Sequence, residues 1–267
     1  MTFAFNMESK IHYHTEGKGP PMVLSHGFMM DLTCWYEFGY VDELKSKFTL
    51  LIIDARGHGE SDKPHIVSEY TGSKMAKDVL SVMDHAGVET AHFLGFSLGG
   101  RTGLELAVIM PHRLRSLIIA SSTPGTRTEA GKKSDRRRIK MFREGPQSVA
   151  RLMDKLSPEM DLYRKKAIEG DLQAYLARTQ AGMRRPDITS KLENLEVPCL
   201  MYAGSSDPLS HQSSMEACKR IPSATFMSLP DLKHMYTFGR TDLVFPLINE
   251  FLGNIPLGEP LQDKGKT

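Results

Sequence analysis

The chain has 267 residues, of which 40% are hydrophobic and 25% are charged, and its formal net charge is +2. This composition is typical of a globular protein with a sizeable core, and the small net charge gives no reason to expect a nucleic acid as partner. Because no apolar run approaches the ~20 residues that a membrane helix needs, we expect no membrane partner either.

The sequence favours the cytoplasm as the compartment. Residues 1–8 lack the basic start and the long apolar run of a signal peptide. The three cysteines, Cys34, Cys199 and Cys218, match no metal-ligand spacing and cannot all pair with one another. Such scattered cysteines are typical of a reducing compartment, so we expect a cytoplasmic protein with no metal site.

The first quarter of the chain alternates strand-like and helical segments. Residues 2–7 and 10–15 alternate weakly and predict an antiparallel pair at the edge of a sheet. Residues 22–25 and 49–53 are short apolar runs, typical of parallel strands that are covered on both faces. Between them, residues 31–47 carry apolar side chains at loosely helical spacing.

A charged turn follows, Asp54-Ala55-Arg56-Gly57-His58-Gly59-Glu60-Ser61-Asp62. Its spacing matches no known metal-ligand set, so we expect Asp54, Arg56 and His58 to hold the loop together by salt bridges and hydrogen bonds. Residues 71–86 predict a helix with one apolar face. Its charged residues fall off that face and are expected to be solvated: Lys74, Lys77, Asp78 and Asp84.

The central motif is Gly95-Phe96-Ser97-Leu98-Gly99, which follows the strand-like residues 91–94 and opens a helical stretch. This G-x-S-x-G pattern is typical of a nucleophile elbow, where a strand turns sharply around one serine into a helix. Gly95 and Gly99 let the strand and helix pass closely without a Cβ clash. The alternative is a glycine-rich turn with an incidental serine, but the strand before and the helix after it favour Ser97 as a nucleophile.

The alternation of strands and helices stops after the strand-like residues 115–120. Residues 126–191 show a helical, polar pattern with no strand-like run, and we interpret them as a helical cap over the carboxyl edge of the sheet. This stretch contains a basic run, which either steers an anionic substrate or forms a solvated helix face; charge runs usually lie in water, which favours the second. The run comprises Lys132, Lys133, Arg136, Arg137, Arg138, Lys140 and Arg143.

The strand pattern returns at residues 197–204 and 224–229, and a titratable residue follows each of these strands. Asp207 stands just past the first, where a carboxylate can orient a histidine, although a turn or helix-cap role is the alternative. His234 stands in the loop after the second, where a general base is needed. Ser97, Asp207 and His234 therefore occur in the chain order nucleophile, acid, base; Asp231 is a weaker candidate for the acid.

We divide the chain accordingly. Residues 1–125 and 192–255 form an α/β core domain with a mostly parallel central sheet flanked by helices. Residues 126–191 form the helical cap. Residues 256–267, rich in glycine, proline and charge, are expected to form a flexible tail.

Together these motifs resemble those of α/β-hydrolase-fold serine hydrolases, over nearly the whole chain apart from the cap and the tail. The elbow and the Arg-Gly-His-Gly turn are similar to those of bacterial esterases and of 3-oxoadipate enol-lactonases. The motifs are His26-Gly27-Phe28, residues 54–62, Gly95-Phe96-Ser97-Leu98-Gly99-Gly100, Gly204-Ser205-Ser206-Asp207 and His234.

The resemblance implies a serine esterase mechanism without metal or organic cofactor. Ser97 attacks an ester or lactone carbonyl, His234 takes its proton, and Asp207 orients the imidazole. The backbone amides of Phe28 and Leu98 are expected to form the oxyanion hole. In the loop before them, His26 is expected to orient the backbone by hydrogen bonds. We expect two methionines to contact the substrate, Met29 and Met235.

Related branches of the fold supply the alternatives. Haloalkane dehalogenases and epoxide hydrolases use an aspartate nucleophile, so Ser97 argues against both. Carbon–carbon bond hydrolases use serine, but many place a tryptophan where this chain has Met235. A cofactor-free perhydrolase or haloperoxidase-like enzyme, and a receptor that binds a small molecule without turnover, remain open. The sequence leaves the natural substrate and the oligomeric state undetermined.

Overall fold

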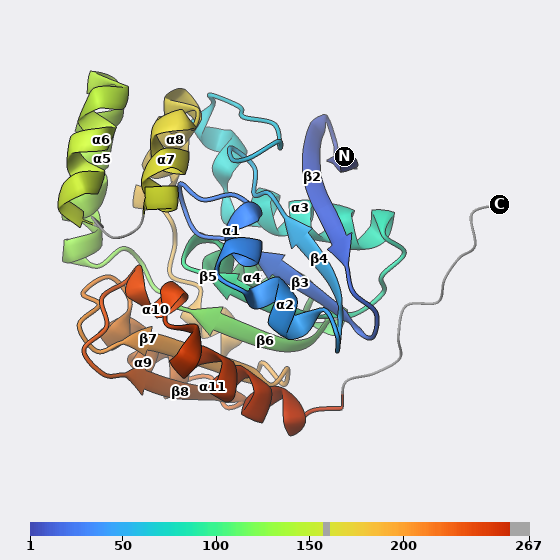
Figure 1. Ribbon diagram of the computed structural model, residues 1–267. Helices are drawn as coiled ribbons and strands as arrows, with labels where there is room; N and C mark the ends of the chain where they lie inside the picture. The colour runs from blue at the N-terminus through green and yellow to red at the C-terminus, as the bar shows by residue number, and fades with distance from the viewer. Residues whose placement is uncertain (157–160, 257–267) are drawn as a thin grey trace.

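A computed structural model describes residues 1–156 and 161–256, and its centre is an eight-stranded sheet in the order β1-β2-β4-β3-β5-β6-β7-β8 (Figure 1). The first two pairs in this order are antiparallel and the others are parallel. The predicted antiparallel pair at the sheet edge is thus confirmed. The strands are β1 (Thr2–Asn6), β2 (Ser9–Glu16), β3 (Pro21–Ser25), β4 (Thr49–Ile53), β5 (Ala91–Phe96), β6 (Leu114–Ala120), β7 (Cys199–Gly204) and β8 (Ala224–Leu229).

Helices cover both faces of the sheet. In Figure 1, α3 and α4 lie behind the sheet, and α1, α2 and α11 lie in front of it. Among the described residues, no helix is long and apolar enough to cross a membrane. The helices outside the predicted cap are α1 (Thr33–Glu37), α2 (Tyr40–Leu44), α3 (Gly72–His85), α4 (Leu98–Ile109), α9 (His211–Cys218), α10 (Tyr236–Gly239) and α11 (Thr241–Gly253), with 3-10 turns η1 (Val67–Tyr70), η2 (Pro111–Arg113) and η3 (Thr189–Leu192).

The side chains of the apolar strands pack into two separate hydrophobic cores, one on each face of the sheet, because successive side chains of a strand point to opposite faces. Along β3, Met22 and Leu24 enter the core on the α11 side, whereas Val23 enters the core on the α3 and α4 side. All five residues of β3 are buried. The short apolar runs therefore have the two-sided burial that parallel strands require.

Four helices lie between β6 and β7, beyond the carboxyl ends of the strands (Figure 1). Within the described parts of residues 126–191 the chain forms helices and turns but no strand, as the sequence pattern indicates. Thr128 and Asp171 cap two of the helices, since each side chain accepts a backbone N–H of the first turn. The four are α5 (Glu129–Glu144), α6 (Pro146–Leu156), α7 (Asp161–Glu169) and α8 (Leu172–Met183). Residues 257–267 of the predicted tail lie outside the described residues.

Two predictions made from the sequence need correction. The helical pattern of residues 31–47 is two short helices, because Gly39 between them adopts φ +77°, which ends the first helix. Asp78 of α3 is buried rather than solvated, because the Arg56 guanidinium donates to both of its carboxylate oxygens, at 2.9 and 2.6 Å. The Arg56–Asp78 ion pair therefore holds the charged turn after β4 against α3.

Candidate active site

Ser97 occupies the sharp turn between β5 and α4, with φ 51° and ψ −98°. Such angles are strained for a residue with a side chain, and residues with strained backbone angles are frequent at functional sites. The neighbouring glycines explain how the turn is tolerated. A Cβ on Gly95 would lie 2.5 Å from the carbonyl carbon of Gly99, and one on Gly99 would lie 1.9 Å from the Ser25 carbonyl oxygen. The two glycines of the motif are therefore sterically required.

The structure brings the three candidate catalytic side chains into one hydrogen-bonded chain. Ser97 Oγ lies 2.8 Å from His234 Nε2, and His234 Nδ1 lies 2.8 Å from Asp207 Oδ2. These residues follow β5, β8 and β7, whose parallel carboxyl ends meet at one edge of the sheet. With Nδ1–H donating to the carboxylate, Nε2 is left to accept the Ser97 hydroxyl proton.

Asp207 is suited to remain ionised, although its side chain is fully buried. Burial would raise the pKa of this carboxyl, but the charge and hydrogen bond of His234 and the donors Ser210 Oγ and Leu209 N–H hold the pKa below its ordinary value. Asp231, the weaker candidate for the acid, is exposed, and its backbone N–H donates to Ser205 Oγ. The geometry therefore pairs His234 with Asp207.

Two backbone amides beside Ser97 are unoccupied. Within the described part of the chain, neither the Phe28 nor the Leu98 N–H donates a hydrogen bond to another protein group. Leu98 is the first residue of α4, where the helix dipole also favours negative charge. The Phe28 loop is held against the elbow by the bond from Gly99 N–H to the His26 carbonyl, at 3.0 Å.

His26 orients this loop, as expected from its position. Its Nδ1–H donates to the Gly27 carbonyl at 2.7 Å, and its Nε2 accepts the Ala55 N–H at 3.0 Å. Burial lowers the pKa of His26, against the opposing effect of Asp54, so the ring stays neutral. Both ring nitrogens are occupied, which leaves His26 a structural role.

Comparisons with known proteins agree with this arrangement. A family model described as the alpha/beta hydrolase fold matches residues 20–145. The chain is 26% identical to 3-oxoadipate enol-lactonase 1 of Acinetobacter baylyi over 249 residues, covering 88% of this chain and 90% of the enol-lactonase. The chain has the α/β-hydrolase fold.

Two further similarities cover nearly the full length of the chain. It is 26% identical to a putative 2-succinyl-6-hydroxy-2,4-cyclohexadiene-1-carboxylate synthase of Bacillus subtilis, over 95% of this chain and 99% of the synthase. It superposes on a malate-bound esterase from Thermogutta terrifontis with a TM-score of 0.79 and 26% identity, covering 92% of this chain and 93% of the esterase.

A small cavity of about 60 Å³ lies beside Ser97 and His234. Phe28, Leu98 and Met235 are among its lining residues. Met29, the other methionine expected to contact substrate, adopts φ 61° and is buried in the hydrophobic core instead of lining this cavity. The helices α5, α7 and α8 also supply lining residues, such as Tyr163 of α7.

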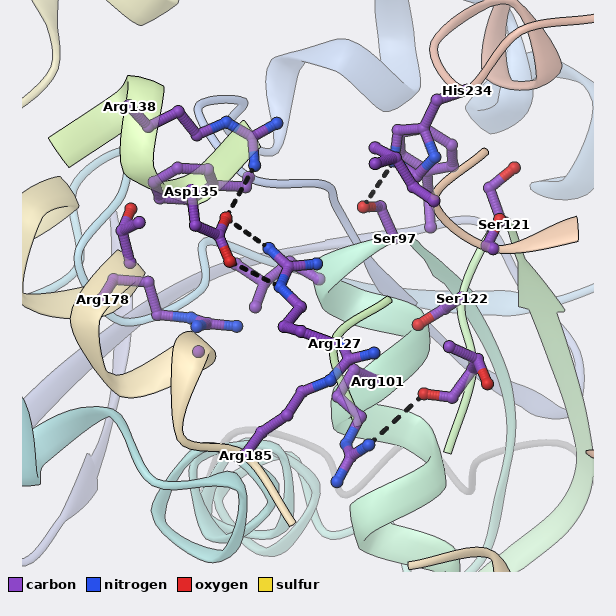
Figure 2. A pocket seen from close by; sticks show the side chains of 18 of the residues that line it. Ser97, Arg101, Ser121, Ser122, Arg127, Asp135, Arg138, Arg178, Arg185 and His234 are labelled. Atoms are coloured by element: carbon purple, nitrogen blue, oxygen red, sulfur yellow. Dashed lines mark hydrogen bonds and ion pairs between the residues drawn. The ribbon is translucent and has the colours of Figure 1, made fainter. Parts of the chain in front are cut away.

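The cavity is unusually rich in arginine. Figure 2 shows Arg101, Arg127, Arg178 and Arg185 below Ser97 and His234, and Arg138 at the upper left. Of these, only Arg138 belongs to the basic run of the sequence, and it lies near Phe28, with its Cζ 5.6 Å from the ring centroid. Most of that run is exposed, on the solvent side of α5.

Sequence reasoning missed the other four arginines because they come from separate segments. Arg101 is in α4, Arg127 precedes α5, Arg178 is in α8, and Arg185 follows α8. They form no run and fit no motif. The available signal was the position of Arg101, one helical turn after Ser97, which places its side chain near the elbow.

Proposed function

We propose that this protein cleaves small carboxylic esters or lactones through an acyl-enzyme on Ser97. The single observation that carries the proposal is the continuous hydrogen-bonded chain from Ser97 Oγ through His234 to Asp207. A serine hydroxyl is a weak nucleophile until an adjacent base accepts its proton. The relatives named as an esterase and an enol-lactonase support the ester bond as the target.

The acylation half-reaction uses each of these groups. Ser97 Oγ attacks the substrate carbonyl carbon while His234 Nε2 takes the hydroxyl proton. The carbonyl oxygen becomes an oxyanion and accepts hydrogen bonds from the backbone N–H groups of Phe28 and Leu98. These two bonds stabilise the oxyanion in the transition state. Asp207 stabilises the imidazolium. Collapse of the intermediate breaks the ester C–O bond, and His234 gives its proton to the leaving alcohol.

Deacylation repeats these steps with water in place of serine. His234 takes a proton from the water while the water oxygen attacks the acyl carbon. The same two amide N–H groups donate hydrogen bonds to the oxyanion that forms. His234 then returns the proton to Ser97. The products are the carboxylic acid and the free enzyme. A lactone substrate gives one product, a hydroxy acid, since its leaving alcohol stays attached.

Covalent labelling tests the nucleophile directly. A fluorophosphonate probe is expected to label the protein at Ser97, and Ser97→Ala is expected to lose both labelling and hydrolysis of 4-nitrophenyl esters. The matched control is Ser81→Ala, whose hydroxyl lies in α3 and donates to the Asp78 carbonyl. Labelling that persists in Ser97→Ala, or hydrolysis that survives at the wild-type rate, would contradict the proposal.

The same preparation separates the alternatives. A receptor without turnover would be labelled by fluorophosphonate yet hydrolyse none of the 4-nitrophenyl esters. A perhydrolase would form peracid from acetate and hydrogen peroxide faster than it hydrolyses esters. A carbon–carbon bond hydrolase would cleave a diketone faster than an ester. Each of these results would replace ester hydrolysis as the main activity.

A further inference from the structure

Two of the cavity arginines, Arg178 and Arg185, lack the partners that such groups normally have. The Nε atoms of both are buried, and neither has a hydrogen-bond partner in the described part of the chain. Among the described residues, the Arg185 side chain makes one hydrogen bond, and it is long, 3.4 Å from Nη2 to the Thr126 carbonyl. The Arg178 side chain forms no hydrogen bond or ion pair with any described residue.

The neighbouring arginines show what full pairing looks like in the same cavity. Arg127 donates to both oxygens of Asp135 at 2.7 Å, and Arg138 donates to one of them at 3.2 Å. Arg101 donates to Glu105 through Nε and Nη2, at 3.0 and 2.7 Å. Each of these three guanidinium groups thus has a carboxylate partner, although Arg127 and Arg138 share one.

The charge around the unpaired groups is strongly positive. Asp135 is the only carboxylate among the described residues that line the cavity, and it is already shared by two arginines. Burial, followed by repulsion from Arg127, lowers the pKa of both Arg178 and Arg185. Unpaired charges of one sign destabilise the fold that holds them together. The position of these two unpaired guanidinium groups beside Ser97 and His234 therefore indicates a functional role for their charge.

We propose that the substrate carries a carboxylate remote from the scissile carbonyl, and that Arg178 and Arg185 bind it while the carbonyl lies at Ser97. This inference rests on the proposed function. Figure 2 shows the Arg178 side chain pointing into the same space that Ser97 and His234 face. A planar guanidinium matches the two oxygens of a carboxylate.

The available space favours a carboxylate over a bulkier anion. The cavity of about 60 Å³ has room for about five water-sized groups, since each needs ~10–15 Å³. A carboxylate is smaller than a phosphate. Arg178 and Arg185 also line a second cavity of about 500 Å³, with Tyr70 and Met75, so an acid of several carbons can extend past them.

The kinetic test compares two esters of equal carbon number, 4-nitrophenyl hexanoate and the mono-4-nitrophenyl ester of adipic acid. The wild type is expected to have the higher kcat/KM for the adipate ester. Arg178→Gln and Arg185→Gln are each expected to lower kcat/KM for that ester by about 10- to 100-fold, mainly through KM, because a hydrogen bond to a charged group is lost. The loss of kcat/KM on the hexanoate ester is expected to be at least fivefold smaller, because that substrate has no carboxylate for either arginine to bind.

Arg136→Gln is the matched control. Arg136 lies on the exposed side of α5, so this variant makes the same change in net charge outside the cavity. Its ratio of kcat/KM values for the two esters is expected to equal that of wild type. Equal kcat/KM for the two esters in wild type, or equal losses on both esters in Arg178→Gln and Arg185→Gln, would overturn the carboxylate site and leave ester hydrolysis standing.

Equilibrium binding gives a readout that does not depend on turnover. In the Ser97→Ala background, calorimetry is expected to detect monomethyl adipate but not methyl hexanoate, and adding Arg178→Gln or Arg185→Gln is expected to abolish the signal. Tighter binding of butyl phosphate than of monomethyl adipate would overturn the assignment to a carboxylate. Arginine-dependent binding of monomethyl adipate by a protein whose wild type hydrolyses no ester would support the site and contradict the proposed function.

Discussion

The ammonium group of Lys166 lies 2.6 Å from the carboxylate of Asp31, and this ion pair joins α7 to the segment that follows β3. That segment also carries Phe28, whose backbone amide we propose as a donor to the oxyanion. Both side chains are partly exposed. One ion pair therefore connects the helices between β6 and β7 to the loop that would receive the oxyanion.

Lys166→Met is expected to loosen α7. The predicted result is faster amide hydrogen exchange in α7 and a stability lower by about 1 kcal/mol or less, since single ion pairs near a surface contribute little. Hydrogen exchange and urea unfolding measure the two effects. The control is Lys165→Met, on the neighbouring exposed residue. If both variants exchange alike, the Asp31 pair is not what holds the helix.

The contribution of this ion pair should disappear at acid pH. Burial would raise the pKa of Asp31, but hydrogen bonds from Lys166 and Thr33 keep it below its ordinary value. A carboxyl whose pKa is lowered in the folded state adds stability above its unfolded pKa of about 3.9, and that stability is lost as the pH falls through the folded value. The stability difference between wild type and Lys166→Met is thus expected to shrink below about pH 4. A constant difference from pH 7 to pH 3 would contradict this explanation.

Asp207→Asn is expected to lower kcat on a 4-nitrophenyl ester by about 10³- to 10⁴-fold, with little change in KM. An amide in place of the carboxylate no longer selects the imidazole tautomer that leaves Nε2 free to accept a proton. The control, Asp231→Asn, is expected to stay within about twofold of wild type. Steady-state kinetics of both variants decides which carboxylate serves His234; a loss smaller than tenfold in Asp207→Asn would reject the assignment.

Arg56→Met is expected to lower the free energy of unfolding by about 3–5 kcal/mol, because it leaves the buried carboxylate of Asp78 without its cation. Replacing both residues, as Arg56→Met with Asp78→Leu, should recover most of that loss. Urea unfolding measures the difference. Arg113→Met removes a surface pair with Asp84 and should cost about 1 kcal/mol or less. An equal cost for the two single variants would mean that the Arg56 pair is not acting as a buried one.

Gly99→Ala is expected to destabilise the fold by about 3 kcal/mol or more and to abolish labelling of Ser97, because its Cβ would overlap the backbone of β3. Gly253→Ala, at the end of α11, is the matched control, since a Cβ there meets nothing within 4 Å. The control should keep wild-type stability and activity. Normal labelling of a folded Gly99→Ala protein would show that the elbow does not need this glycine.

Local patterns in the sequence were sufficient for most of the fold. The short apolar runs at residues 22–25 and 49–53 predicted buried parallel strands, because two-sided burial leaves no polar face to interrupt the run. The pairing of the first two strands followed from their weak alternation. Gly39 shows the limit of this reasoning: a helical pattern continued across it, while its left-handed backbone divides the segment in two.

The order and spacing of a few residues likewise identified the candidate site. Ser97, Asp207 and His234 each follow a strand-like run, and parallel strands place their carboxyl ends at one edge, so chain order alone predicted that they meet. Asp78 was assigned wrongly because its partner, Arg56, is on a distant segment. A charged residue next to an apolar helix face is solvated in most helices, and only the packed structure shows the exception.

The sequence by itself determined which serine, carboxylate and histidine are the candidate catalytic residues, and which strand each of them follows. Only the tertiary structure decided what surrounds them. Met29 and Met235 each follow a candidate site residue directly in the chain, yet only Met235 lines the cavity. Arg178 in α8 and Arg185 just after it reach the cavity from more than eighty residues beyond Ser97. No local pattern encodes that approach, because side-chain proximity across segments depends on how the helices pack.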